Sequence, residues 1–227
     1  MNTLLITGAS GGLGQDVVTH LHEQGYHILA TVGSGRHVNL FDTLPNVETK
    51  EVNVVDETSV NTFLNEHESD SIQAAILLVG GFAMGTIQET DTALLQSMFD
   101  VNFLSVFNLV KPLMAKFEKQ GKGQFVFIGA RPALHANEGK NVVAYALSKT
   151  LVFELADIIN AQGKSKNITA TVIVPSTIDT PTNRTAMPDA DPSRWVPASN
   201  IAELIGFLLN DTGQMMRETV IKLYNRA

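Results

Sequence analysis

Short apolar runs rich in β-branched residues alternate along this chain with longer segments in which apolar residues recur at helical spacing. The runs TLLITG, AAILLVGG, QFVFIGA and ATVIVPS are almost continuously apolar, as is typical of strands covered on both faces of a parallel sheet. This alternation predicts a single doubly wound α/β domain over residues 1–227, with a mostly parallel sheet of about seven strands and helices on both faces. The predicted strands are 3–7, 26–32, 48–54, 73–79, 123–129, 168–174 and 218–223, and the predicted helices are 13–24, 57–67, 91–118, 143–162 and 199–210.

Net charge, the absence of Cys and the length of the apolar runs exclude several classes of function. The net charge is −7 and the Lys and Arg residues are scattered, so nucleic-acid binding is not expected. The chain has no Cys, which excludes disulfides and thiolate chemistry and fits a cytoplasmic protein. No apolar run approaches the roughly 20 residues of a membrane span, and the six His do not form a metal-binding motif. We therefore expect a soluble protein with no metal and a small-molecule substrate.

The segment 180–199 breaks the alternation of strands and helices. It contains Pro181, Pro188, Pro192 and Pro197 and has no clear periodicity. Because a loop of this length inside a compact domain is usually functional, the sequence predicts a substrate lid here.

A glycine-rich turn links the first predicted strand to the first predicted helix. TGASGGLG places Gly8, Gly12 and Gly14 in a G-x3-G-x-G pattern, with Ser10 and Leu13 between them. Glycine permits a tight turn and a close approach of backbone N–H groups to a pyrophosphate, while the helix N-terminus supplies partial positive charge. The turn therefore predicts a dinucleotide site in a sheet of Rossmann type.

The second predicted strand ends in ILATVGSGRH, which contains Ser34 and Arg36 but no carboxylate. An acidic residue there would accept hydrogen bonds from the ribose of NAD, whereas an arginine can pair with the 2′-phosphate of NADP. The sequence thus favours NADP(H), with NAD(H) possible. The alternative interpretation is that Arg36 is simply a solvated loop residue.

Tyr145 and Lys149 are four residues apart in YALSK and share one face of the predicted helix 143–162. An ammonium group that favours phenolate by roughly 3 to 4 kcal/mol would lower the pKa of a phenol from about 10 to about 7 to 8. Such a phenol can exchange a proton at neutral pH, so the pair is a candidate for acid–base catalysis. The alternative is an ordinary surface pair.

Taken together, these motifs resemble the short-chain dehydrogenase/reductase family. VGGF, with Gly80 and Gly81, is similar to that family's turn after the fourth strand, and VPSTIDTP is similar to its segment after the sixth. The resemblance implies that Lys149 also binds the nicotinamide ribose, and that Asn102 holds a water linking Lys149 to solvent; the alternative for Asn102 is a packing role in its helix. It also implies adenine contact by Asn53 or Asp56, although Asp56 suits a helix N-cap equally well. The full set of candidate cofactor contacts is Gly8, Ser10, Gly12, Leu13, Gly14, Ser34, Arg36, Asn53, Gly80, Gly81, Tyr145, Lys149, Pro175 and Thr180.

Most members of that family have a serine after the fifth strand, but no Ser or Thr occurs between residues 125 and 144 here, where Ala130 and Arg131 stand instead. Losing a donor to a developing oxyanion typically costs about 10² to 10³ in rate, so a plain ketone is a poor candidate substrate. The dihydropteridine reductase branch also lacks this serine, and its lid is similar to DTPTNRTAMPDADPSRWVP. That branch uses NADH through an acidic residue absent here. Trp195 in the lid is placed either to stack on a flat bicyclic ring or to anchor the lid.

The sequence therefore predicts an NAD(P)H-dependent reductase of quinonoid dihydropterin or a similar quinonoid or imine acceptor, with Tyr145 as proton donor. One alternative is a carbonyl or ketoacyl reductase in which water or Arg131 replaces the serine. Another is a non-catalytic NADP(H) sensor. Apolar residues outside one stripe of the helices 91–118 and 143–162 predict a homodimer or homotetramer.

Overall fold

Seven parallel strands form the central sheet of the computed structural model, which describes residues 2–226. Their order is β3-β2-β1-β4-β5-β6-β9, so the chain starts near the middle of the sheet and winds outward in both directions. The predicted doubly wound parallel sheet is confirmed. The strands are β1 (Thr3–Thr7), β2 (His27–Val32), β3 (Val47–Glu51), β4 (Ile72–Leu77), β5 (Gly123–Ile128), β6 (Ile168–Pro175) and β9 (Thr219–Leu223).

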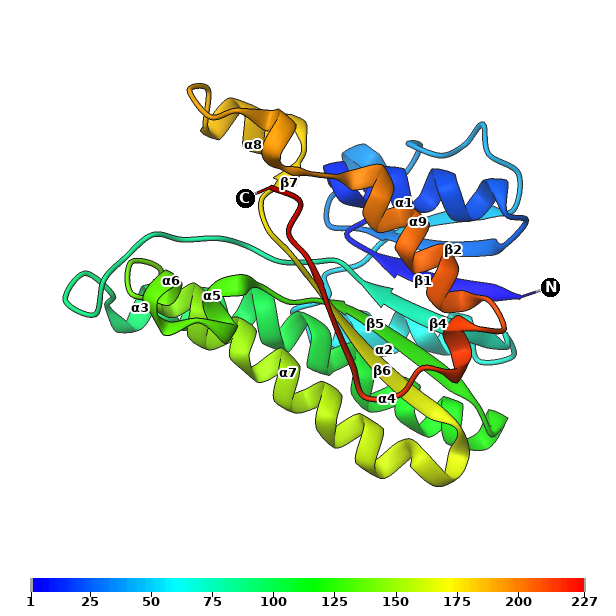
Figure 1. Ribbon diagram of the computed structural model, residues 1–227. Coiled ribbons are helices and arrows are strands. Elements are labelled where there is room, and N and C mark those ends of the chain that lie inside the picture. Colours follow the sequence, from blue (N-terminus) through cyan, green and yellow to red (C-terminus); the bar gives the residue numbers. More distant parts are fainter. Residues whose placement is uncertain (1, 227) are drawn as a thin grey trace.

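Helices cover both faces of this sheet, with α1 and α9 on one side and α3, α4 and α7 on the other (Figure 1). In β1 the side chains alternate between the two layers: Leu4 and Ile6 pack toward α1 and α9, while Leu5 packs toward α4 and α7. Burial on both faces explains why the strands are almost continuously apolar. The longer helices are α1 (Gly12–Glu23), α2 (Glu57–Glu66), α3 (Thr92–Phe99), α4 (Ser105–Gln120), α7 (Val143–Gly163) and α9 (Ala198–Leu209).

The predicted helix 91–118 is interrupted by a π-helical turn, Asp100–Leu104, between α3 and α4. Asn102, inside this turn, forms side-chain hydrogen bonds with Gly81 and Ser148, which lie outside its own helix. Just after the turn, the Ser105 hydroxyl donates to the Val101 carbonyl at 2.6 Å. Single π turns often occur at functional sites. The hydrophobic pattern did not predict this interruption, because the contacts of Asn102 depend on residues distant in the sequence.

By length and mean hydropathy alone, the helical stretch Thr92–Gln120 is apolar enough to cross a membrane. In the fold, however, the apolar side of α4 is part of the core, since Leu109, Leu113 and Phe117 are fully buried against the sheet. Packing on the sheet therefore accounts for part of its hydropathy, with 33% of the apolar window buried.

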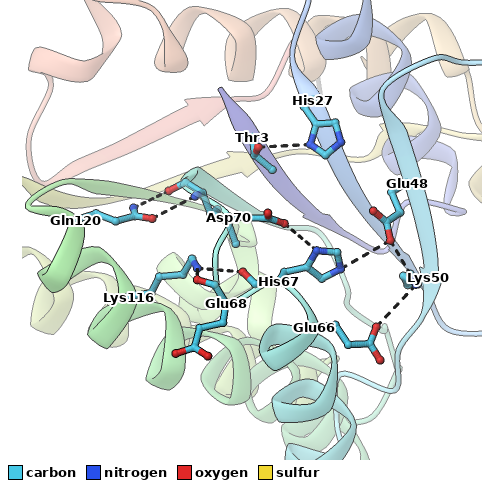
Figure 2. Close-up of polar contacts among 11 residues, drawn as sticks. Thr3, His27, Glu48, Lys50, Glu66, His67, Glu68, Asp70, Lys116 and Gln120 are labelled. Atoms are coloured by element: carbon cyan, nitrogen blue, oxygen red, sulfur yellow. Dashed lines mark hydrogen bonds and ion pairs between the residues drawn. The ribbon is translucent and has the colours of Figure 1, made fainter. Parts of the chain in front are cut away.

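A polar cluster fixes the edge strand β3 to the neighbouring helices (Figure 2). His67, which caps the C-terminus of α2, bonds Asp70 through Nδ1 at 2.8 Å, and its Nε2 lies 3.9 Å from Glu48 of β3. The Lys116 ammonium of α4 donates to the carbonyls of His67 and Glu68. Together these contacts hold β3 in place although it pairs with β2 alone.

The segment 180–199 is more ordered than the predicted loop. It contains helix α8 (Pro181–Ala186), a 3₁₀ turn (Pro192–Arg194) and the strand β8 (Val196–Pro197), which pairs with β7 (Ile178–Asp179). Proline at the first helical position is compatible with a helix start, so Pro181 and Pro192, which break the periodicity, also begin two of these short elements. The two short helices α5 (Arg131–Leu134) and α6 (Ala136–Gly139) were likewise not predicted.

Candidate active site

The glycine loop lies at the carboxyl end of β1 and opens α1. Gly8 has φ +68°, a left-handed conformation that favours glycine. A Cβ on Gly14 would overlap the Gly8 carbonyl oxygen, and a Cβ on Gly12 would lie 2.9 Å from Thr180 Cβ. These glycines therefore permit close packing of the loop, the helix and the start of the 180–199 segment, and they bring Thr180 to the predicted cofactor loop.

The N-terminal turn of α1 has no acidic side chain and no side-chain cap. Gly11 N–H closes the turn by donating to the Gly8 carbonyl at 3.0 Å, and Gln15 Nε2 donates to the Ser10 carbonyl at 2.9 Å. Leu13 points into the core, so its backbone alone is placed for a ligand. Backbone N–H groups at such a helix start, with their partial positive charge, suit a phosphate group.

Asn102, Lys149 and the Gly80–Gly81 turn meet just after the end of β4. Asn102 is fully buried; its Oδ1 accepts from Gly81 N–H at 2.9 Å, and its Nδ2 lies 3.1 Å from both the Gly81 carbonyl and Ser148 Oγ. Lys149 is buried and donates to the Ile128 carbonyl at 2.9 Å. A Cβ on Gly80 would lie 2.9 Å from Asn102 Oδ1 and 3.2 Å from Lys149 Nζ, so this turn leaves room only for glycine.

Burial changes the pKa values of both members of the Tyr145 and Lys149 pair. It raises the pKa of the Tyr145 phenol to about 12 and lowers the pKa of the Lys149 ammonium to about 8. The prediction that Lys149 lowers the phenol pKa is therefore wrong for this structure. The physical reason is that burial removes both groups from water, which disfavours the charged form of each.

Ala130 and Arg131 follow β5, at the position where most members of the resembled family have a serine. Ala130 is buried, and Arg131 Nη2 bonds Glu138 Oε1 at 2.7 Å while its guanidinium carbon lies 4.6 Å from the centre of the Tyr224 ring. The nearby Ser148 hydroxyl donates to the Tyr145 carbonyl at 2.9 Å. Ser148 and Arg131 Nη2 are engaged in these contacts, whereas the buried Arg131 Nε has no hydrogen-bond partner among the described residues.

The residues predicted to contact the adenosine half of a dinucleotide lie at the ends of β2 and β3. Ser34 Oγ accepts from the backbone N–H and the Nε of Arg36, both at 3.5 Å, and Asn53 Oδ1 accepts from Val55 N–H at 3.2 Å. Asp56 caps α2 through Thr58 N–H, which confirms the capping interpretation of that residue. Glu51, the last residue of β3, also reaches this end of β2 and was not predicted from the sequence.

The C-terminal residues fasten the 180–199 segment to the end of the sheet. Asn225 Nδ2 donates to the Trp195 carbonyl at 2.6 Å, and the Arg194 guanidinium donates to the Arg226 carbonyl. Trp195 is only 6% exposed, so it anchors this segment and presents little surface for stacking on a ring. Pro175, buried at the end of β6, lies where the segment begins.

These features fit a nicotinamide dinucleotide. The cradle formed by Gly8, Gly12 and Gly14 excludes side chains, the first turn of α1 carries no acidic residue, and Lys149 and Tyr145 lie at the carboxyl end of the same sheet. In open α/β sheets, ligands bind outside the carboxyl ends of the strands, where the strand order reverses.

Comparison with known proteins supports the same assignment. The chain is 28% identical to the dihydropteridine reductase of Dictyostelium discoideum over 231 residues, covering 99% of this chain and 95% of that relative. It is 25% identical to the 3-oxoacyl-[acyl-carrier-protein] reductase FabG of Salmonella typhimurium, covering 91% of this chain and 89% of that one. The solved structure of ElxO with NADP bound has the same fold, with a TM-score of 0.89 at 21% identity over 98% of this chain and 96% of that one. Residues 2–191 match the family model described as short chain dehydrogenase. The chain therefore belongs to the short-chain dehydrogenase family of oxidoreductases.

Proposed function

We propose that this protein is an NAD(P)H-dependent reductase that acts on quinonoid dihydropterin or a similar quinonoid or imine acceptor. The proposal rests on the residues after β5. Ala130 lies where most members of the family have a serine hydroxyl, and the neighbouring Arg131 is paired with Glu138. An acceptor that develops no full alkoxide loses little from this gap. The similarity to a dihydropteridine reductase along 99% of the chain supports the same substrate class.

The cofactor would be held by the Gly8–Gly14 loop and the first turn of α1 at its phosphates, and by Tyr145 and Lys149 at the nicotinamide ribose. A reduced nicotinamide supplies a hydride when it is bound. Arg36 at the end of β2 is the candidate partner for a 2′-phosphate, which supports NADP(H) as the favoured cofactor.

Tyr145 would donate the proton that accompanies the hydride. With a pKa of about 12 the phenol keeps its proton at neutral pH and is therefore in the donor form. Lys149, one helical turn along α7 with a pKa of about 8, exchanges a proton near neutral pH and can return one to the phenolate. The acceptor thus gains one hydride and one proton, which is a two-electron reduction.

Asn102 would act as a positioning residue. Its amide bonds both the N–H and the carbonyl of Gly81, and Gly80 next to it borders Lys149 Nζ. We therefore propose that Asn102 sets the shape of the Gly80–Gly81 turn around Lys149.

Replacement of Tyr145 by Phe tests the proposed reaction. We expect turnover of quinonoid dihydropterin with NADH or NADPH to fall at least 10²-fold, because the proton donor is lost. The dissociation constant of the cofactor should rise far less than turnover falls, because only one of the proposed ribose contacts is removed. The wild-type assay must include simple ketones. No oxidation of either cofactor with any acceptor would refute the reductase function and favour a non-catalytic sensor.

A second candidate is a carbonyl or ketoacyl reductase. The 25% identity to a 3-oxoacyl-[acyl-carrier-protein] reductase supports it. It requires a donor other than the missing serine; Arg131 pairs with Glu138 through Nη2, but its buried Nε has no partner among the described residues and is the candidate donor. Ketone or ketoacyl turnover above that of quinonoid dihydropterin would decide in its favour.

We also propose a homodimer or homotetramer that acts in the cytoplasm. Large apolar side chains of α4 and α7 remain exposed, with Phe107 at 40%, Leu147 at 49% and Ile158 at 52% exposure. Burying them against a second copy would remove apolar surface from water. A monomer in sedimentation velocity at micromolar concentration would contradict this assembly. The absence of Cys supports the location.

A further inference from the structure

Glu51 of β3 brings an acidic side chain to the carboxyl end of β2, a strand that does not end in an acidic residue. Val32, the last residue of β2, pairs in parallel register with Glu51, the last residue of β3. The Glu51 carboxylate reaches over the loop that follows β2, because a Cβ placed on Gly35 would lie 2.7 Å from Glu51 Oε2. A carboxylate therefore borders the loop that carries Ser34 and Arg36, although the sequence of that loop contains none.

In dinucleotide-binding sheets, the residues at the carboxyl end of the second strand help to determine whether NAD or NADP binds. An acidic residue about 20 residues beyond the glycine loop hydrogen-bonds the 2′-hydroxyl of the adenosine ribose, whereas an arginine accommodates a 2′-phosphate. In this chain the two groups come from different strands, Arg36 from the loop after β2 and Glu51 from β3. Apart from its chain neighbours, no atom of the described residues lies within 4 Å of a Cβ built on Gly33, so there is open space beside the first residue after β2.

We propose that the Glu51 carboxylate contacts the 2′ position of the adenosine ribose. It thereby gives the protein affinity for NADH in addition to NADPH. This inference rests on the proposed dinucleotide function. The carboxylate accepts hydrogen bonds from the ribose of NADH, and it opposes the negative charge of a 2′-phosphate that Arg36 attracts. The absence of an acidic residue at the end of β2 is therefore compensated through space by the neighbouring strand.

The strand itself supplies a matched control. Glu48 lies three residues before Glu51, so the two side chains point to opposite faces of β3. Glu48 faces α2, where its carboxylate contacts Lys50 and His67 (Figure 2). Replacing Glu48 by Gln changes the net charge as much as replacing Glu51 does, but on the face away from the Gly35 loop.

The test is equilibrium binding of NADH and NADPH to the full-length protein, followed by the fluorescence of the reduced nicotinamide. For Glu51→Gln we expect about tenfold tighter NADPH binding, because a like charge is removed from beside the phosphate, and severalfold weaker NADH binding. For Glu48→Gln we expect less than a twofold change in the ratio of the two dissociation constants. Glu51 is exposed, so its replacement leaves the core intact.

A second variant moves the carboxylate without removing it. Gly35 does not have a left-handed backbone, so Ala is sterically allowed there, and its methyl group would displace the Glu51 carboxylate from the loop. Gly35→Ala should shift the ratio in the same direction as Glu51→Gln. A ratio that stays within twofold of wild type in Glu51→Gln, or an equal shift in Glu48→Gln, would overturn the inference alone. Failure of the wild type to bind either cofactor would instead refute the proposed function, and the inference with it.

Discussion

Lys149 is a buried ammonium group with no carboxylate partner among residues 2–226, and its replacement should reveal the energetic penalty of that arrangement. Burial lowers its pKa from 10.5 to about 8. At about 1.4 kcal/mol per pKa unit, the charged form destabilises the folded protein by about 3 kcal/mol. Lys149→Met, which keeps a long unbranched side chain, removes this penalty together with the proposed proton relay.

The sign of the pH dependence follows from proton binding. Folded Lys149 releases its proton at a lower pH than unfolded Lys149, so between about pH 8 and 10.5 the unfolded state binds more protons and stability rises with pH. The penalty is fully present below pH 8 and falls to about 1 kcal/mol at pH 9.5. The difference in unfolding free energy between Lys149→Met and wild type should therefore shrink by about 2 kcal/mol from pH 6 to pH 9.5.

Urea unfolding of both proteins at half-unit pH steps measures this difference. Removing the Lys149 hydrogen bond to the Ile128 carbonyl also costs stability, but that loss does not depend on pH, so it shifts the curve without changing its slope. Lys119→Met, on the exposed side of α4, controls for the loss of a positive charge. A difference that stays constant within about 0.5 kcal/mol across this range would refute the argument from burial.

Three further substitutions test other parts of the site. Asn102→Ala leaves both backbone groups of Gly81 without their buried partner and should lower the urea unfolding free energy by about 2 to 4 kcal/mol; a loss below about 1 kcal/mol would contradict that role. Asn225→Ala releases the Trp195 carbonyl and should raise the KM of the acceptor severalfold with kcat nearly unchanged, whereas an equal fall in kcat would argue against a role in lid positioning. Ala130→Ser should raise ketone turnover by about 10- to 100-fold relative to quinonoid dihydropterin, and an unchanged ratio would show that the missing hydroxyl does not select the substrate.

Local features of the chain were sufficient to predict most of the fold. Apolar runs gave the seven strands of the sheet, and five amphipathic segments predicted helices that end within about two residues of the observed ones, apart from the π turn at Asp100–Leu104. The glycine spacing and the four-residue spacing of Tyr145 and Lys149 are also local. They predict chemistry because a turn and one helical face are determined by neighbouring residues.

What the sequence could not determine depends on contacts between distant residues and on burial. Asn102 meets Gly81 and Ser148 across 21 and 46 residues, and Asn225 meets Trp195 across 30. The pKa of Tyr145 moved against expectation because spacing sets only the distance to Lys149, whereas desolvation is set by everything packed around the phenol.

The loop after β2 also combines a feature that the sequence predicts with one that only the tertiary structure shows. From the sequence, the loop after β2 has an arginine and no acid, which favours a 2′-phosphate. Pairing of β2 with β3 then brings the Glu51 carboxylate to Gly35, about 16 residues along the chain but adjacent in the sheet. The sequence by itself therefore determined the seven strands of the sheet, the five long helical segments and the residues that the glycine loop and the Tyr145 helix present. Only the tertiary structure decided which charges face one another, because electrostatic interactions depend on distance in space and on exclusion of water, and neither is a property of a local pattern.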